Sequence, residues 1–340
     1  MGLFDGPETG EGSTADLAAR LNLPVILTVN CSHQAQSIAA LVSGFASFRK
    51  DVHIAGVILN WVSSERHTRM LTDAVEALGI KVIGAVPRVN DLQLPSRHLG
   101  LVQAHEHPEI QTFIERAGKI GAASVDLELL VSLAKPLPHT TNNNRTTLPP
   151  LGQHIAIARD EAFGFLYPHL LENWRAAGAQ ISFFSPLANQ APDTSANAIF
   201  LPGGYPELHG STLANNVTFL DALRSTNAPV YGECGGYMVL GDAIIDKDGN
   251  SHQMAGLLPV TTSFATRKLT LGYRTLTHNS ALPWPKHLKA HEFHFSTVEN
   301  QSAADPLFEA TDTNGSALPP MGLKRGNVMG SYAHIIDEAP

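Results

Sequence analysis

A cysteine flanked by glycines is the residue of this chain best suited to covalent chemistry. Cys234 lies in the segment GECGGYM (232–238), where an apolar strand is expected to run into a helix. The G-x-C-x-G spacing is typical of a nucleophile elbow, a sharp turn that tolerates only small neighbours. The helix N-terminus favours a thiolate, and the amide of Gly235 can stabilise an oxyanion. The alternative is a buried structural cysteine beside a glycine-rich turn.

Two further segments favour the reactive interpretation. In LPGGYPE (201–207), a strand ends in a Gly-Gly turn, which can offer the amide of Gly204 to the same oxyanion. In GSYAH (330–334), His334 is a candidate base, since a cysteine nucleophile commonly takes its base from a distant part of the sequence. The chain has 16 histidines, so spacing alone would not select this one.

Length and composition indicate a two-domain cytoplasmic protein. The 340 residues exceed the usual size of one core, and 43% of them are hydrophobic. The net charge of −8 argues against nucleic-acid binding, and no apolar run is long enough for a membrane span. Two cysteines are too few for a disulfide framework or a cysteine-built zinc site, and no HExxH motif is present. No metal ligands are identified.

The elements that must position these residues follow an α/β pattern in the first half of the chain. Apolar strands are predicted at 24–30, 53–60 and 81–87, with helices at 33–49 and 64–79 between them. This alternation predicts a parallel sheet with helices on its faces.

The second half repeats the alternation after a segment rich in Pro, Asn and Thr. Strands are predicted at 154–158, 180–184, 198–204 and 228–233, helices near 164–177 and over 206–225, and further strands from 255 onward. One of the later strands carries His291, Glu292 and His294. We expect the two histidines on one face of it and Glu292 on the other.

LPGGYPE, GECGGYM and the late SYAH resemble the glutaminase domain of cobyrinate (hydrogenobyrinate) a,c-diamide synthases, which are class I, triad-type amidotransferases. Further matching segments are MGLFDG (1–6), LPSRHLGL (94–101), RDEAFGFLYP (159–168), LGYR (271–274) and HEFHFS (291–296). The resemblance implies an α/β protein with two parts. A partial P-loop NTPase-like (dethiobiotin-synthetase-like) parallel-sheet domain is followed by a flavodoxin-like class I glutamine amidotransferase domain.

The resemblance also implies a reaction. Cys234 would attack the side-chain amide of glutamine, His334 would move the proton, and the amides of Gly204 and Gly235 would hold the oxyanion. The ammonia would then amidate the a and c carboxylates of cobyrinate or hydrogenobyrinate, activated with ATP and magnesium, in cobalamin biosynthesis. The implied partners are glutamine, ATP and a corrinoid; family members can pair into homodimers, and the sequence does not give the oligomeric state. The alternatives are a cobyric acid synthase and a truncated or non-catalytic corrinoid-binding subunit, and the motifs do not distinguish cobalt-containing from cobalt-free substrates.

The expected domains are a partial ATP-dependent synthetase domain (1–133), a linker (134–152) and the amidotransferase domain (153–340). The family's first domain opens with a phosphate-binding P-loop, and no GxxxxGK[ST] motif occurs here. Three explanations are open: a fragment or misassigned start codon, a separate polypeptide that supplies the P-loop, or loss of synthetase activity. A parallel sheet without its central strands would expose apolar faces, so we expect this chain alone to be poorly stable.

Four residues of the first domain receive site predictions on the same resemblance. Asp5 is expected near the nucleotide or corrinoid, and Asn60 near adenine; a turn Asp and a strand C-cap are the alternatives. Arg97 and His98 are expected to face an anionic substrate, with a solvated loop as the alternative. The partner that orients His334 is not identified, because Ile336 occupies the position where many related glutaminases have Glu.

Overall fold

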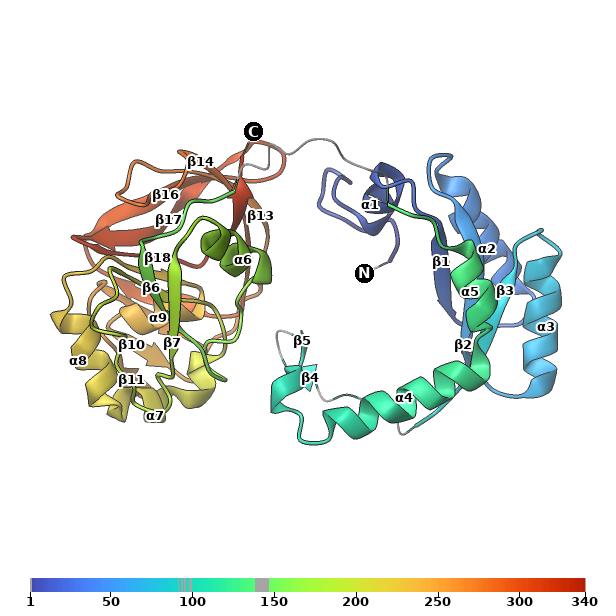
Figure 1. The fold of residues 1–340 in the computed structure, drawn as a ribbon, viewed down its shortest axis with the longest axis horizontal. Helices are drawn as coiled ribbons and strands as arrows, with labels where there is room; N and C mark the ends of the chain where they lie inside the picture. The colour runs from blue at the N-terminus through green and yellow to red at the C-terminus, as the bar shows by residue number, and fades with distance from the viewer. Residues whose placement is uncertain are drawn as a thin grey trace. The chain divides into compact units, whose positions relative to one another are not determined.

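The computed structural model describes residues 2–90, 92, 94, 96–97, 100–137 and 147–339, and it divides into two compact units (Figure 1). Unit 1 is Met1–Asn143 and unit 2 is Asn144–Pro340. The central part of the predicted linker, 138–146, lies outside the described residues.

Unit 1 is built on the three parallel strands that the apolar runs predict, and they lie in the order β1-β2-β3. The strands are β1 (Val25–Asn30), β2 (Ile54–Val62) and β3 (Val82–Pro87), and the helices are α1 (Thr14–Arg20), α2 (Ser37–Phe48), α3 (Glu65–Glu76), α4 (Ile110–Ser124) and α5 (Leu127–Leu133). A short hairpin, β4 (Ser96–Arg97) with β5 (Gly100–Leu101), and the 3-10 helix η1 (Ala104–Glu106) precede α4. The predicted β-α-β-α-β order is therefore present.

Local sequence explains how the unit 1 helices begin and which face they bury. The side chain of Ser64 accepts a hydrogen bond from the backbone N–H of His67, which caps the first turn of α3. Leu71 and Val75, four residues apart, form the buried face of that helix. They join one hydrophobic core with residues of β1 and β2.

Unit 2 is organised by a ten-stranded mixed sheet whose two halves differ in strand direction. The parallel half consists of β18 (Val328–Ser331), β9 (Val230–Glu233), β8 (Ala198–Leu201), β6 (His154–Ala158) and β7 (Gln180–Phe184), in that order. The antiparallel half consists of β19 (His334–Glu338), β14 (His287–His294), β13 (Thr270–Thr277), β16 (Asp305–Thr311) and β17 (Ala317–Arg325), which joins β18. These five antiparallel strands therefore extend the parallel sheet beyond β18.

Helices and a second small sheet cover unit 2. The helices are α6 (Pro168–Ala176), η2 (Pro206–His209), α7 (Gly210–Asn215), α8 (Val217–Ser225) and α9 (Gly235–Leu240). The four-stranded sheet has the order β11 (Ser251–Gln253), β10 (Ala243–Ile245), β12 (Val260–Ser263) and β15 (Thr297–Gln301). The helix predicted over 206–225 is thus three short helices, and the last break falls at Asn216, whose backbone is not helical.

Each face of the large sheet has its own hydrophobic core, because successive side chains of a strand point to opposite faces. Val230 of β9 packs with residues of α8 and α9, whereas the next residue, Tyr231, packs with α6 and the antiparallel strands. β6, β8 and β9 are buried along their whole length. The end of β9, where Cys234 follows, is therefore held rigidly from both sides.

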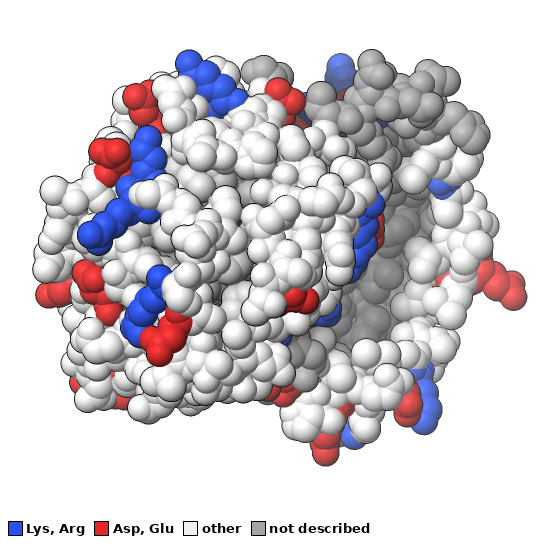
Figure 2. Space-filling view, turned by 60° about the vertical axis from the view of Figure 1, so that its left-hand side comes forward, with Lys and Arg blue, Asp and Glu red and all other residues white. Residues whose placement is uncertain are grey.

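The charged surface and the helix lengths concern the predictions on nucleic acid and on the membrane. On the face in Figure 2, Lys and Arg side chains lie interspersed with Asp and Glu and form no large patch of one sign. Within the described part of the chain, no helix has both the length and the apolar character that a bilayer span requires.

Candidate active site

Cys234 lies at a strained turn between β9 and α9. Its backbone has φ 46° and ψ −103°, a conformation that non-glycine residues rarely adopt outside functional sites. The backbone N–H of Cys234 donates to the carbonyl oxygen of Ser331 (2.8 Å), and that of Gly236 donates to Pro202 (3.1 Å). The turn is thus tied to the ends of β18 and β8, which is the geometry that the G-x-C-x-G spacing predicts.

The glycines around Cys234 are required because backbone atoms approach them closely. A Cβ atom added to Gly236 would lie 1.9 Å from the carbonyl oxygen of Leu201, and one added to Gly204 would lie 2.1 Å from that of Ala162. Real Cβ atoms do not approach other atoms this closely, so the Gly-Gly turn can pack against the elbow only without side chains.

Two backbone amides meet beside the thiol. A Cβ atom added to Gly235 would lie 3.0 Å from the amide nitrogen of Gly204, so the two predicted oxyanion donors border the same space. Gly235 is the first residue of α9, where an amide has no acceptor within the helix. This pair of amides can stabilise a negative oxygen that forms during attack on a carbonyl.

His334, the first residue of β19, reaches the same space from the other half of the sheet. A Cβ atom added to Gly203 would lie 2.5 Å from Cε1 of His334 and 3.3 Å from Cβ of Cys234, so the two side chains border one small volume. The imidazole ring stacks on that of His291, with ring centres 4.8 Å apart, and Tyr167 contacts both rings edge-on. The structure therefore brings the predicted nucleophile and base together.

Burial keeps the resting site neutral. Cys234 and His334 are 1% and 2% exposed. Burial, followed by the charge of Glu207, raises the pKa of the Cys234 thiol to about 12, while the Gly235 amide acts in the opposite direction. Burial, assisted by His291 and His294, lowers the pKa of His334 to about 3. A thiol and a neutral imidazole are thus favoured before substrate binds.

An acidic residue that the sequence did not single out faces His334. Glu233, the residue before the nucleophile, has its Oε2 3.9 Å from Nδ1 of His334. Asp337 and Glu338, which are nearer to His334 in sequence, lie farther along β19, where they pair with Lys289 and Leu288, and Asp337 is exposed. A strand-ending Glu carries no sequence signal of such a role, because its partner is distant in the chain.

The expectation for the histidines of β14 was wrong. Residues two apart in a strand share a face, and His291 and His294 are three apart. Glu292 and His294 lie on one face, where Oε1 of Glu292 and Nε2 of His294 are 2.9 Å apart and Arg274 binds the other carboxylate oxygen. His291, on the opposite face, is the histidine that stacks on His334.

A cavity of about 420 Å³ in unit 1 lies at the carboxyl ends of β1 and β2, where open α/β sheets bind ligands. Its lining includes Trp61, Arg66 and Arg88, and the Arg88 guanidinium lies 5.3 Å from the centre of the Trp61 ring. These cations and the aromatic ring fit a ligand that carries both negative charge and a flat base.

Neither Asn60 nor Asp5, the two unit 1 site predictions whose side chains are described, lines this cavity. Asn60 precedes Trp61, and its Oδ1 accepts a hydrogen bond from the Trp61 amide. The carboxylate of Asp5 accepts one from the Gly2 amide, which closes the N-terminal turn. Arg97 belongs to β4, with its side chain outside the description, and His98 lies outside the described residues.

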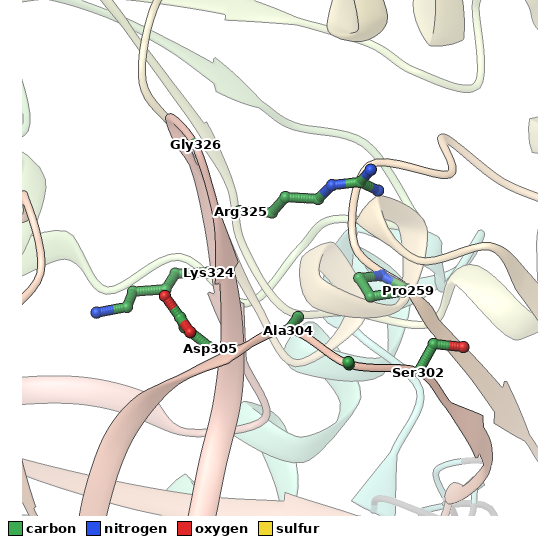
Figure 3. A pocket seen from close by; sticks show the side chains of 8 residues that line it. Pro259, Ser302, Ala304, Asp305, Lys324, Arg325 and Gly326 are labelled. Carbon is green, nitrogen blue, oxygen red and sulfur yellow. The ribbon is translucent and has the colours of Figure 1, made fainter.

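A second cavity, of about 610 Å³, lies where β17 ends. This strand end pairs with the start of β18, which runs parallel to β9, so the cavity lies at the end of the sheet opposite Cys234. In Figure 3, Lys324 and Asp305 extend to one side of the strand and Arg325 to the other. None of the candidate catalytic residues lines it. For metals, the residues that the structure describes contain no group of three or more His, Cys, Asp and Glu placed to hold an ion.

Comparisons with known proteins agree with this geometry. A family model described as a CobB/CobQ-like glutamine amidotransferase domain matches residues 154–340, and a model of an AAA domain matches residues 2–96. A hydrogenobyrinate a,c-diamide synthase of Brucella abortus is 53% identical over 99% of this chain and 78% of its own length. One from Rhizobium meliloti is 50% identical over 99% of this chain and 79% of its own length.

A solved structure is similar to about half of the chain. A glutamine amidotransferase from Thermotoga maritima covers 53% of this chain and 75% of its own, with 16% sequence identity and a TM-score of 0.37. The family matches and the site geometry rest on independent observations.

Proposed function

Because the chain belongs to the family of hydrogenobyrinate a,c-diamide synthases, we propose that it amidates the a and c carboxylates of hydrogenobyrinate with ammonia from glutamine. It is a glutamine-hydrolysing amidotransferase of cobalamin biosynthesis. The relatives' name favours this function over the cobyric acid synthase alternative. The observation that carries the chemistry is the meeting of Cys234 and His334 around Gly203.

The proposed first step is hydrolysis of glutamine in unit 2. His334 takes the thiol proton of Cys234, and the sulfur attacks the side-chain amide carbon, while the amides of Gly204 and Gly235 stabilise the oxyanion. His334 then returns the proton to the leaving nitrogen, which departs as ammonia and leaves a thioester. Water, deprotonated by His334, cleaves the thioester to give glutamate and restores the thiol.

For unit 1, the AAA-domain match makes ATP use plausible, and ATP would activate the carboxylates for attack by ammonia. We propose that Arg66, Arg88 and Trp61 face ATP in the cavity at the ends of β1 and β2. Asn60 and Asp5 remain candidates for the nucleotide side, and Arg97 and His98 for the corrinoid. Magnesium, a homodimer and a cytoplasmic location stay predictions.

The test is an amidation assay with the full chain, hydrogenobyrinic acid, ATP, magnesium and either glutamine or ammonium. We expect mass spectrometry to detect the diamide with both nitrogen sources. Cys234→Ala should lose the glutamine-driven reaction and retain the ammonium-driven one, because it lacks only the source of ammonia. A variant that uses glutamine as well as the wild type would contradict the assignment of Cys234.

A further inference from the structure

Two buried polar atoms face one another in unit 2 without hydrogen-bond partners. Among the described residues, Oε2 of Glu233 and Nδ1 of His334 both lack one, and they are 3.9 Å apart. Burying unpaired polar atoms costs free energy, so such a pair in a packed core points to a functional role. We propose that Glu233 is the positioning residue that orients His334 and stabilises its protonated form during glutamine hydrolysis.

The fold fixes the carboxyl group of Glu233 by its other oxygen. The backbone N–H of Ile335, the residue after His334, donates to Oε1 of Glu233 (3.1 Å). Glu233 pairs in register with Ser331 of β18, and the chain then turns through two residues to His334. This anchor leaves Oε2 directed at the imidazole, so the segment that carries His334 also sets the position of its carboxyl partner.

The other acidic side chains near the site are engaged elsewhere or face away. The carboxylate of Glu292 is bound by Arg274 and His294. Asp337 is exposed on the far part of β19. Glu233 is 1% exposed and is the acidic residue whose carboxyl group faces the His334 ring within 4 Å in the described structure.

The remaining titratable neighbours are neutral near pH 7. His291 stacks on His334, and burial lowers its pKa; Tyr167 contacts both rings, and burial raises its pKa. Tyr231, on the same face of β9 as Glu233, has a raised pKa because it is buried and, next, because the Glu233 carboxyl group lies near its hydroxyl, which in turn lowers the pKa of Glu233. None of these groups can supply the negative charge that a protonated His334 needs.

The orientation matters because the two imidazole nitrogens have different tasks. A proton on Nδ1, directed at Glu233, leaves the lone pair of Nε2 free to accept the thiol proton of Cys234. That transfer makes an imidazolium, which an ionised Glu233 stabilises. The separation of 3.9 Å exceeds a hydrogen bond, and catalytic contacts of this kind commonly tighten when substrate binds.

Ionisation of Glu233 adds a pH dependence to the reaction. Burial raises the pKa of its carboxyl group to about 8. Below that pH the protonated form dominates and cannot balance the imidazolium, so glutamine hydrolysis should accelerate as the pH rises through about 8. A residue that only supported the fold would not produce this dependence.

The decisive variant is Glu233→Gln, which keeps the side-chain size and an oxygen for the Ile335 amide. Its NH₂ group would face Nδ1 and favour the tautomer with the proton on Nε2, which cannot act as a base. We expect kcat for glutamate release to fall about 10²- to 10⁴-fold, where the upper value is the loss when a catalytic histidine loses its carboxylate partner. The KM for glutamine should change less than about twofold, and the rise of kcat near pH 8 should disappear.

Two comparisons separate this role from a structural one. Glu233→Asp keeps the charge at a shorter reach and should recover at least about tenfold over the Gln variant together with the pH dependence. Glu338→Gln, a change of the same chemistry on β19, should stay within about twofold of the wild type. If Glu233→Gln does not fold, as judged by circular dichroism, the Asp variant decides: its kcat should still rise with pH, and a kcat that does not depend on pH there contradicts the proposal.

The inference rests on the proposed glutaminase function, and the assay distinguishes their failures. If the wild-type chain releases no glutamate, the proposed function fails. The rate at which a chloroketone analogue of glutamine alkylates Cys234, followed by mass spectrometry, then tests Glu233 alone, with at least a tenfold decrease expected in Glu233→Gln. A Gln variant with the wild-type kcat, pH profile and alkylation rate would overturn the role of Glu233.

Discussion

Two cysteines of this chain occupy similar places in different sheets. Cys31 follows β1 and Cys234 follows β9, and each is buried at the carboxyl end of a parallel strand. The backbone N–H of Cys31 donates to the carbonyl oxygen of Asn60 (2.8 Å), and that of Cys234 donates to Ser331 at the same distance. Burial raises the pKa of both thiols.

The difference lies in the backbone and in what surrounds the sulfur. Of the two cysteines, only Cys234 has a positive φ. Only Cys234 is followed by glycines, which allow the Gly-Gly turn at 203–204 to approach it closely. The thiol of Cys31 donates to the carbonyl oxygen of Val29 (3.3 Å), whereas Cys234 borders an imidazole and two backbone amides. A buried thiol therefore becomes a candidate nucleophile through its neighbours, and burial with a strand end is not enough.

Replacing the two cysteines should give the largest contrast. We expect Cys234→Ala to lower glutamate release from glutamine at least about 10⁴-fold, because no other group near the turn can form the thioester. Cys31→Ala should retain most of the activity, since its thiol satisfies only a local carbonyl. The measurement is a coupled glutamate assay on both variants, and similar losses in the two would show that the comparison of their surroundings is misleading.

Replacement of His334, the predicted base, should have the second-largest effect on activity. His334→Asn removes the group that moves the proton, and we expect kcat to fall about 10²- to 10⁴-fold with the KM for glutamine little changed. His169→Asn is a suitable control, because His169 is exposed, and its contacts in the described structure are a hydrogen bond to the carbonyl oxygen of Ile336 and a ring contact with Tyr167, not with Cys234. Steady-state kinetics with glutamine would check both, and an active His334→Asn would require a different base.

A methyl group added at Gly203 should disturb the place where the side chains of Cys234 and His334 meet. Gly203→Ala would place Cβ 2.5 Å from the His334 ring, and we expect about a tenfold or greater loss of kcat from the displaced imidazole. Gly44→Ala, in the middle of α2, meets no atom within 4 Å and should stabilise the protein by about 0.5–1 kcal/mol. Kinetics and urea denaturation would show whether the first change acts on activity and the second on stability.

The smallest effect should be the dependence of stability on pH. The pKa of His334 is about 3 in the folded protein and about 6.5 in the unfolded chain, so the unfolded chain binds a proton first as the pH falls. The stability linked to neutral His334 is complete above pH 6.5 and is lost as the pH falls towards 3. Between pH 6.5 and 5 this amounts to about 2 kcal/mol, which His334→Asn should not lose. The measurement is urea denaturation of both proteins at pH 7, 6 and 5. If the prediction is wrong, the free energy of unfolding will fall equally with pH in the wild type and in His334→Asn.

The positions of the strands in unit 1 are readable from local patterns. The apolar runs at 24–30, 53–60 and 81–87 correspond to β1, β2 and β3, because a strand buried on both faces needs a continuous apolar sequence. The helix predicted over 206–225 was less accurate, since its breaks depend on backbone conformations at the 3-10 turn and at Asn216. The continuous sheet that joins β17 to β18 could not be predicted, because strand pairing is not local.

The candidate site also has features that local sequence predicts and features that depend on residues distant in the chain. Small residues around Cys234 are visible in the sequence, because a tight turn leaves no room for side chains there. The contact of His291 with His334 was missed, and the faces of β14 were assigned wrongly by an error in the spacing of residues along a strand. Glu233 cannot be identified from the sequence, because it is simply the last residue of a strand and its partner, His334, is distant in the chain.

The sequence by itself determined the elbow at Cys234, the Gly-Gly turn that faces it and the family to which the chain belongs, since each depends on short runs of residues whose backbone requirements are local. Only the tertiary structure decided what lies around His334. That residue reaches the elbow because β18 runs parallel to β9 and the chain then turns into β19. The approach of Glu233 and His334 to within 3.9 Å follows from this pairing of distant strands, which no local pattern encodes.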